Sequence, residues 1–354
     1  MKIEMDDCIK NSTGSNNFDN ATFDWCAQEL ELNGYSMLPL SALRSHRRKD
    51  VPTLIARAFA TARVALDNNA SRMLIDPNSD SASWTGFHNA ASINGRYNQH
   101  REGFVFSNGE MFDVEVSVNH PHANFRNDMN QLFRIMHDNV ATGVLQAIER
   151  RLKIPHCHFQ HELGPTNNSS QWHMKRYVVD DQRNLSSNSN EDQQSGEEIL
   201  LPAHTDPSLI SVVVLDRVGL NVGGLGLEVF HPYTPRTIVG GGEWREIPHH
   251  GHDVAVIFVG SVLSYLTKGK VFPAAKHRVV RWRSSCTETI GNQVQDFIES
   301  RMAATLFVRP NGDAIMKPLA SSDALQKNHP SFRVWNARVA KNYMKSRRKS
   351  SKLN

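Results

Sequence analysis

The sequence predicts an α+β fold with a mainly β core, in which helices of the N-terminal half pack on a C-terminal double-sheet jelly roll. Three observations favour this class. Apolar residues recur at helical spacing before residue 155, and short β-branched runs follow it. The runs are separated by glycines and polar turns, without the intervening helices of a parallel sheet. The 354 residues, 39% of them hydrophobic, are enough for one large core or two domains.

The N-terminal half predicts three helices, a strand, and short strand-like pieces such as "GFVFS" between residues 68 and 120. In residues 23–30 the apolar side chains recur at helical spacing, Gly34 ends the helix, and "YSMLPL" reads as a short strand. "VPTLIARAFATARVALD" (51–67) predicts a second amphipathic helix. Asn124 to Leu152 predicts a long third helix with one apolar face.

The C-terminal half reads as a succession of strands. The candidates are "SLISVVVL", "LGLEVFH", "EWREIPH", "DVAVIFVGSVLSYLT", "KHRVVRW" and "RMAATLFVRP". Residues 181–198 are polar and of low complexity, which is typical of a surface loop. We therefore expect four regions: a disordered N-terminus, a helical and mixed region, a jelly-roll domain, and a C-terminal helix with a basic tail, over residues 1–20, 21–155, 156–320 and 321–354.

Composition and charge restrict the class of protein. The net charge of +4 comes largely from the tail "YMKSRRKSSKLN", which we interpret as a solvated terminus, so no nucleic-acid partner is expected. Four scattered cysteines favour a reducing compartment. No secretory signal and no apolar run of bilayer length is present. We expect a cytoplasmic protein, a monomer that acts on a small molecule and has no membrane partner.

Two polar side chains interrupt the apolar run "EILLPAHTDPSLISVVVL". His204 and Asp206 are two residues apart, so on a strand they point to the same side. His277, in the β-branched run "KHRVVRW", is the best third ligand. Two imidazoles and one carboxylate on one face of a metal are typical of Fe(II) oxygenases. The three residues therefore predict an iron site.

A second cluster competes for a metal. "PHCHFQH" brings together potential zinc ligands, namely His156, Cys157, His158 and His161. A structural zinc site needs four closing ligands, and no second ligand pair lies at a suitable distance. The iron site is therefore preferred.

At this level the chain resembles the non-haem Fe(II), 2-oxoglutarate-dependent dioxygenases, in the branch that contains isopenicillin N synthase and plant oxygenases. "PAHTDPSLISVVV" is similar to the family's His-Thr-Asp segment, and "GLGLEVF…GEWREIP" to its Gly-Leu-Gln-Val and Gly-x-Trp hairpin. "HDVAVIFVGSVLSYLTKGKVFPAAKHRVV" follows the segment that ends in His-Arg-Val. The resemblance implies a distorted double-stranded β-helix with His204, Asp206 and His277 as iron ligands.

The resemblance also implies the co-substrate site. "RMAATLFVRPN" is similar to the family's Arg-x-Ser strand, which gives Arg301 the clamp position for 2-oxoglutarate, and Tyr177 in "HMKRYVV" matches a supporting tyrosine. Ala303 replaces the family's serine, a hydroxyl that Thr305 or a water would have to supply, and Lys175 replaces an asparagine. Two further arginines nearer to His277 in sequence are rival clamps, namely Arg281 and Arg283.

The implied activity is oxidation of a small molecule by Fe(II), 2-oxoglutarate and O2, with ascorbate as reductant and succinate and CO2 as products. Hydroxylation, desaturation and ring closure all remain open. So do three rival readings: an iron oxidase that does not use 2-oxoglutarate, a cupin-like hydrolase or isomerase, and a non-catalytic binding scaffold. Candidate contacts for a carboxylate-bearing substrate are Arg96, Tyr97, Arg101 and Lys175.

Overall fold

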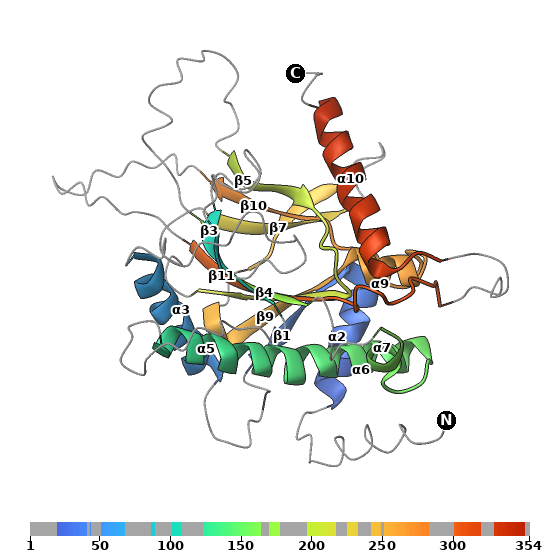
Figure 1. The fold of residues 1–354 in the computed structure, drawn as a ribbon, viewed down its shortest axis with the longest axis horizontal. Helices are drawn as coiled ribbons and strands as arrows, with labels where there is room; N and C mark the ends of the chain where they lie inside the picture. Colours follow the sequence, from blue (N-terminus) through green and yellow to red (C-terminus); the bar gives the residue numbers. More distant parts are fainter. Residues whose placement is uncertain are drawn as a thin grey trace.

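Two antiparallel sheets face each other in the computed structural model (Figure 1). The structure describes residues 20–40, 43, 51–67, 86–88, 101–107, 123–163, 170–177, 197–216, 225–232, 242–248, 251–282, 301–319 and 329–350. The proposed disordered N-terminus, apart from Asn20, and residues 181–196 of the predicted loop lie outside these ranges, whereas Glu197 and Glu198, at the end of that loop, belong to a strand. The predicted mainly β, jelly-roll core with helices packed on it is confirmed.

The larger sheet has seven strands in the order β1-β9-β6-β11-β4-β3-β2. Their bounds are β1 Tyr35–Pro39, β2 Gly86–His88, β3 Arg101–Ser107, β4 Gln171–Tyr177, β6 Ile210–Leu215, β9 Val254–Val259 and β11 Arg301–Val308. Strands β1, β2 and β3 come from the N-terminal half, so this half is not only a helical layer. The N-terminal strands complete the sheet on which the helices rest.

The smaller sheet has four strands in the order β5-β10-β7-β8. Their bounds are β5 Glu197–His204, β7 Leu225–His231, β8 Glu243–Glu246 and β10 His277–Trp282. The register pairs His277 with His204, and the pairing is irregular between His277 and Val280. The two predicted histidine ligands therefore stand side by side on neighbouring strands.

Strand alternation divides the apolar side chains of the larger sheet between two cores. On β6, Val212 and Val214 join the cluster beneath the helices, whereas Val213 and Leu215 join the cluster between the sheets. Strand β6 is buried on both faces, which explains why it reads as a continuous apolar run. The cluster between the sheets contains the pocket described below.

The helices cover the outer face of the larger sheet (Figure 1). Their bounds are α2 Asn20–Asn33, α3 Val51–Asp67, α5 Ala123–Arg134, η4 Ile135–Ala141 and α6 Thr142–Leu152. The prediction for 51–67 matches α3 to the residue, and Gly34, with a φ of +77°, follows α2 as expected. The long third helix is present, but η4 is a π-helical segment within it, which apolar periodicity did not predict.

Two sequence predictions need correction. The run "DVAVIFVGSVLSYLT" is not one strand: η6 (Gly251–Asp253) precedes β9, and residues after Gly260 form α9, Ser261–Leu266. A Cβ on Gly260 would lie 1.9 Å from the carbonyl oxygen of Ser208, so the chain turns there at a backbone contact that only glycine permits. Asp206 also lies beyond the end of β5, so strand alternation does not orient it.

The remaining helices lie away from the barrel interior. The "PHCHFQH" segment leads into α7, His158–Leu163, where the buried carboxylate of Glu149 accepts hydrogen bonds from the backbone N–H groups of Cys157 and Phe159. Among the described residues, this segment forms no cluster of metal ligands. The segment is instead held by a helix-capping carboxylate, which a pattern of histidines cannot reveal.

The C-terminal helix α10, Phe332–Ser350, packs through Phe332 and Trp335.

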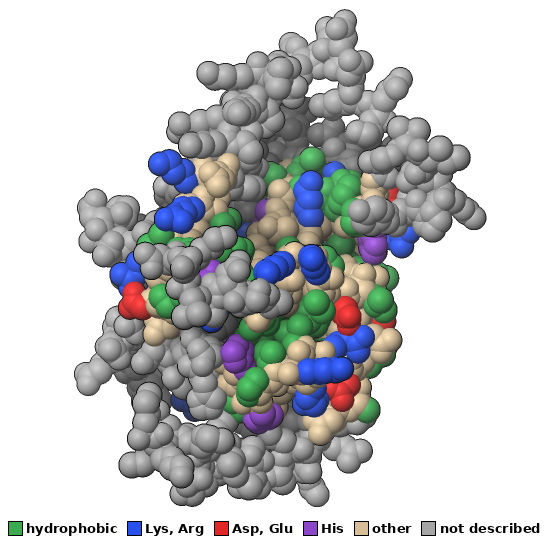
Figure 2. Space-filling model, turned by 90° about the vertical axis from the view of Figure 1, so that its right-hand side faces the viewer, with side chains coloured by type: hydrophobic (Ala, Val, Ile, Leu, Met, Phe, Trp, Pro, Cys, Tyr) green, Lys and Arg blue, Asp and Glu red, His purple; other side chains and the backbone are tan. Residues whose placement is uncertain are grey.

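On the face seen in Figure 2, the described Lys and Arg side chains are scattered among apolar and acidic ones. The expectation of no nucleic-acid partner stays a prediction. Among the described helices, none is both long and apolar enough to cross a bilayer.

Candidate metal centre

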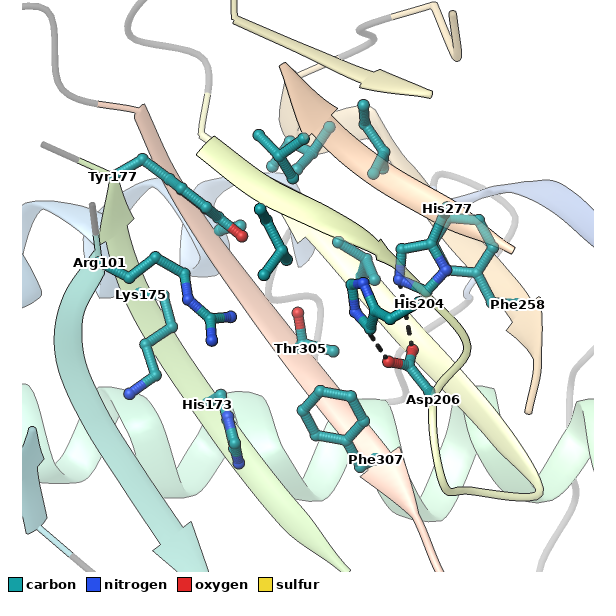
Figure 3. Close-up of a pocket in the computed structure, with 16 residues that line it drawn as sticks. Arg101, His173, Lys175, Tyr177, His204, Asp206, Phe258, His277, Thr305 and Phe307 are labelled. Carbon is teal, nitrogen blue, oxygen red and sulfur yellow. Dashed lines mark ion pairs between the residues drawn. The ribbon is translucent and has the colours of Figure 1, made fainter. Parts of the chain in front are cut away.

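A pocket opens between the two sheets. Its lining has three parts: a cluster of histidine and carboxylate, a basic wall, and apolar surfaces between them (Figure 3). The lining residues are Arg101, His173, Lys175, Tyr177, Leu201, His204, Asp206, Val213, Leu215, Leu227, Phe258, His277, Val279, Ala303, Thr305 and Phe307.

His204, Asp206 and His277 converge at one side of the pocket (Figure 3). One ligand atom from each lies within 4.8 Å of the others. The Nε2 atom of His204 is 3.5 Å from Asp206 Oδ1, and the Nε2 atom of His277 is 3.7 Å from Asp206 Oδ2. This spacing leaves the three donor atoms around a common point, as a metal ion requires. They are the only such group of three among the described residues.

Backbone carbonyls fix which ring nitrogen faces the cluster. The Nδ1 atom of His204 lies 2.9 Å from the carbonyl oxygen of Pro202, and that of His277 lies 3.1 Å from the carbonyl oxygen of Ala275. Each Nδ1 therefore donates its hydrogen to the backbone, and each Nε2 presents a lone pair to the cluster. This is the arrangement that metal-ligating histidines commonly adopt.

Contacts around the cluster hold the backbone of Asp206 and one ring in place. The N–H and Oγ of Ser261 donate hydrogen bonds of 2.7 and 3.0 Å to the carbonyl oxygen of Asp206. The Phe258 ring stacks on His277 at 4.4 Å between centroids, with 5° between the planes. Asp206 lies beyond the end of β5, so the Ser261 contacts, and not strand alternation, fix its backbone.

Burial and neighbouring charges set the protonation of the cluster. Burial alone would raise the pKa of Asp206, but His277, together with hydrogen bonds from His204 and Ser211, holds that pKa well below its usual range. Burial, partly offset by Asp206, lowers the pKa of His277 to about 4. At neutral pH the carboxylate is thus ionised and the His277 ring is neutral, which are the ligand forms.

The wall opposite the cluster is basic. Figure 3 shows Arg101 of β3 and Lys175 and Tyr177 of β4 on the far side of the pocket, with Thr305 and Phe307 between them and the cluster. Burial, and then the charge of Arg101, lowers the pKa of Lys175 to about 7. Two predicted substrate contacts, Arg101 and Lys175, thus meet in one wall.

The residues predicted to bind the co-substrate occupy neighbouring positions in the sheet. Arg301 opens β11 directly opposite Tyr177, and Ala303 stands opposite Lys175. Ala303, Thr305 and Phe307 line the pocket, so alternation points that face of β11 inward. The side chains of Arg301 and of the rival Arg281 lie outside the described part.

The other candidate residues fall outside the described ranges. They are Arg96, Tyr97 and Arg283. Conversely, sequence reasoning did not single out His173 and Phe258, because each sits alone in an apolar strand pattern. Only the partners across the sheet reveal that they face the pocket.

One family model matches part of the chain. The model of the 2OG-Fe(II) oxygenase superfamily matches residues 176–310, a span that includes His204, Asp206, His277 and Arg301. No curated protein matches the sequence.

Solved structures share the fold at low sequence identity. A full-length Neurospora crassa protein in complex with alpha-KG matches with a TM-score of 0.60 at 14% identity, over 91% of this chain and 90% of that one. The rice dioxygenase for auxin oxidation gives 0.58 at 17%, over 91% of each chain. A putative oxygenase from Shewanella oneidensis gives 0.57 at 15%, over 90% and 94%. Residues 176–310 thus match the 2OG-Fe(II) oxygenase superfamily, oxidoreductases that use Fe(II), 2-oxoglutarate and O2, and the His-Asp-His cluster fits that chemistry.

Proposed function

We propose that the protein oxidises a small organic molecule, with His204, Asp206 and His277 as the ligands of Fe(II). The observation that carries the proposal is the convergence of three donor atoms within 4.8 Å, with both imidazoles aimed by backbone carbonyls. Neutral imidazole and ionised carboxylate suit Fe(II), and three protein ligands leave coordination positions for other molecules. Bound iron would supply the activation of O2 that drives the oxidation.

We further propose that Arg301 and Tyr177 hold the distal carboxylate of 2-oxoglutarate. Their register across β11 and β4 supports this, as does the position of Tyr177 on the pocket wall. A guanidinium binds a carboxylate in a bidentate manner. Ala303 offers no hydroxyl, and Thr305, two residues along on the same inward face, carries one. Oxidative decarboxylation would release succinate and CO2.

The protein's own contribution is to position the substrate and to exclude water from the pocket. Apolar side chains line the pocket, among them Val213, Leu227 and Phe258. A dry interior protects a reactive centre from water and strengthens each polar contact that aims the substrate. Hydroxylation, desaturation and ring closure all begin with attack on a substrate C–H bond, so this geometry serves each of them.

A second candidate is an oxidase of the same fold that does not use 2-oxoglutarate. Ala303 at the place of the family's serine favours it, because the distal carboxylate loses one hydrogen bond, worth about 1.5–3 kcal/mol when charge-assisted. The superfamily match weighs against a hydrolase, an isomerase and a non-catalytic scaffold.

Turnover of 2-oxoglutarate by iron-loaded protein tests the proposal. The wild type, supplied with Fe(II), ascorbate, O2 and 2-oxoglutarate, should form succinate even without its primary substrate. His277→Ala and Asp206→Ala should lose both succinate formation and iron binding. Arg301→Ala should keep iron and raise the KM for 2-oxoglutarate by about tenfold or more, since a charge-assisted contact is lost.

Matched surface variants provide the controls. His156→Ala and Arg338→Ala remove the same residue types at exposed positions and should leave iron binding and turnover unchanged. Oxygen consumption without succinate would favour the oxidase. A wild-type protein that binds neither iron nor 2-oxoglutarate would refute both candidates.

A further inference from the structure

Lys175 is the charged group of the pocket that neither the metal nor the co-substrate accounts for. It lies half-buried on the wall opposite the cluster, next to Arg101 and between the strand positions of His173 and Tyr177 (Figure 3). Among the described residues, no carboxylate lies within ion-pair distance of its ammonium, and Asp206, the one acid lining the pocket, belongs to the metal cluster. A cation in a low-dielectric wall is costly unless an anion joins it.

The proposed co-substrate does not supply that anion. Its inner carboxylate belongs at the metal, and its distal carboxylate is assigned to Arg301 and Tyr177. Lys175 stands one inward position further along β4 than Tyr177, opposite Ala303, and Arg101 approaches from β3 on the other side. Because β4 lies between β11 and β3, Arg101 reaches the pocket wall from the side of β4 away from Arg301, next to Lys175.

We propose that Arg101 and Lys175 together bind a carboxylate of the primary substrate, so that the enzyme oxidises an organic acid; this rests on the proposed function. The guanidinium offers a planar pair of donors and the ammonium a point charge, a combination that suits a carboxylate. The acid group would be anchored at the wall, and its carbon skeleton would extend past Thr305 and Phe307 toward the cluster. Two fixed ends direct one part of the skeleton at the reacting centre.

Binding of simple acids to the loaded enzyme tests the inference without relying on turnover. The probes are phenylacetate, 3-phenylpropanoate and hexanoate, each compared with its neutral methylamide. They are titrated by calorimetry into full-length protein carrying Fe(II) and 2-oxoglutarate without O2. In the wild type at least one acid should bind about tenfold more tightly than its amide, as a charge-assisted contact of about 1.4 kcal/mol predicts.

The variants separate the two possible sources of the carboxylate. Lys175→Met and Arg101→Met should each abolish the preference for acid over amide, and Lys175→Arg should retain part of it. The affinity for 2-oxoglutarate should change by less than about threefold in Lys175→Met, because its carboxylates bind elsewhere. Lys270→Met removes an exposed lysine outside the pocket and should behave like the wild type.

Each outcome decides the matter. No preference for any acid in the wild type, or a preference that survives Lys175→Met, overturns the inference. A loss of 2-oxoglutarate affinity in Lys175→Met with unchanged acid binding assigns the pair to the co-substrate and also overturns it. If the wild type fails to bind iron and 2-oxoglutarate, the proposed function fails, and the same titration into the unloaded protein still measures the acid preference.

Discussion

At the scale of single residues, the pocket buries several polar and charged side chains. Each of them lowers the stability of the fold unless a partner compensates it. Asp206 and His277 are buried polar groups. The carboxylate of Asp206 is compensated by the two imidazoles and by Ser211, and the His277 ring by Asp206 and the carbonyl oxygen of Ala275. Phe258 covers one face of the His277 ring and prevents it from rotating out of the cluster. Lys175 has no comparable partner among the described residues, so its cost remains in the ligand-free protein.

The stability of the ligand-free protein should reveal the cost of Lys175. Its pKa of about 7 lies below the ordinary lysine value of 10.5, so the charged form is disfavoured in the folded state. The penalty is complete below pH 7 and disappears as pH rises toward 10.5. Lys175→Met should therefore raise Tm most at a pH of about 6.5, and the gain should shrink steadily by about pH 9.5. Differential scanning fluorimetry across this range measures it.

Other titratable or charged groups face Lys175 and could contribute to a pH-dependent change in Tm. They are Arg101 from β3, His173 and Tyr177 from β4, and the cluster across the pocket. Lys270→Met, at an exposed site, should show no pH-dependent gain in Tm. A gain in Lys175→Met that does not vary between about pH 6.5 and 9.5 would mean that packing, not charge, causes it.

At the scale of elements, the close contact of β3 with β4 places Arg101 in the pocket. Gly103 has a φ of +148°, and a Cβ on it would lie 2.0 Å from the carbonyl oxygen of Met174. Gly103→Ala should lower Tm by several degrees, because a strained φ costs about 1–3 kcal/mol and the clash adds to it. Thermal unfolding measures the loss, and weaker binding of acid probes should accompany it.

Gly269 allows the effect of a positive φ to be measured apart from the effect of a steric clash. Gly269 also has a positive φ, +65°, but a Cβ there meets only Ser264 Oγ, at 3.7 Å. Gly269→Ala should therefore lose less stability than Gly103→Ala. Equal losses would show that the contact between β3 and β4 tolerates a side chain.

The sequence predicted an element well where the interactions that determine it join residues close together in the chain. Periodicity and Gly34 placed α2, β1 and α3 because a helix face and a helix end are local properties. The same logic failed at 261–266, since a short apolar run fits a helix or a strand and the decisive contact is with the distant Ser208. In the site, spacing brought out His204 and Asp206, and the resemblance gave roles to His277, Tyr177 and Arg301. No local signal marked Phe258 or His173, which face the pocket only through sheet pairing.

At the scale of the whole molecule, strands from both sides of the expected boundary between residues 155 and 156 pair in one sheet. Strand β1 pairs along its whole length with β9, and β3 pairs with β4. The N-terminal half therefore supplies an edge strand, the strand that carries Arg101, and the helices that cover the outer core. We infer that residues 21–155 and 156–320 form one cooperative unit rather than two domains.

Unfolding experiments on the full chain and on its C-terminal part test this unity. The full chain should unfold by denaturant in one transition, with fluorescence and far-UV circular dichroism giving the same midpoint. A fragment of residues 156–320 should lack a cooperative transition, because the edges of β9 and β4 would be unpaired and the outer core exposed. A fragment that unfolds cooperatively and binds Fe(II) would instead establish the jelly roll as an independent domain. In that case the N-terminal half would serve mainly to bring Arg101 to the pocket.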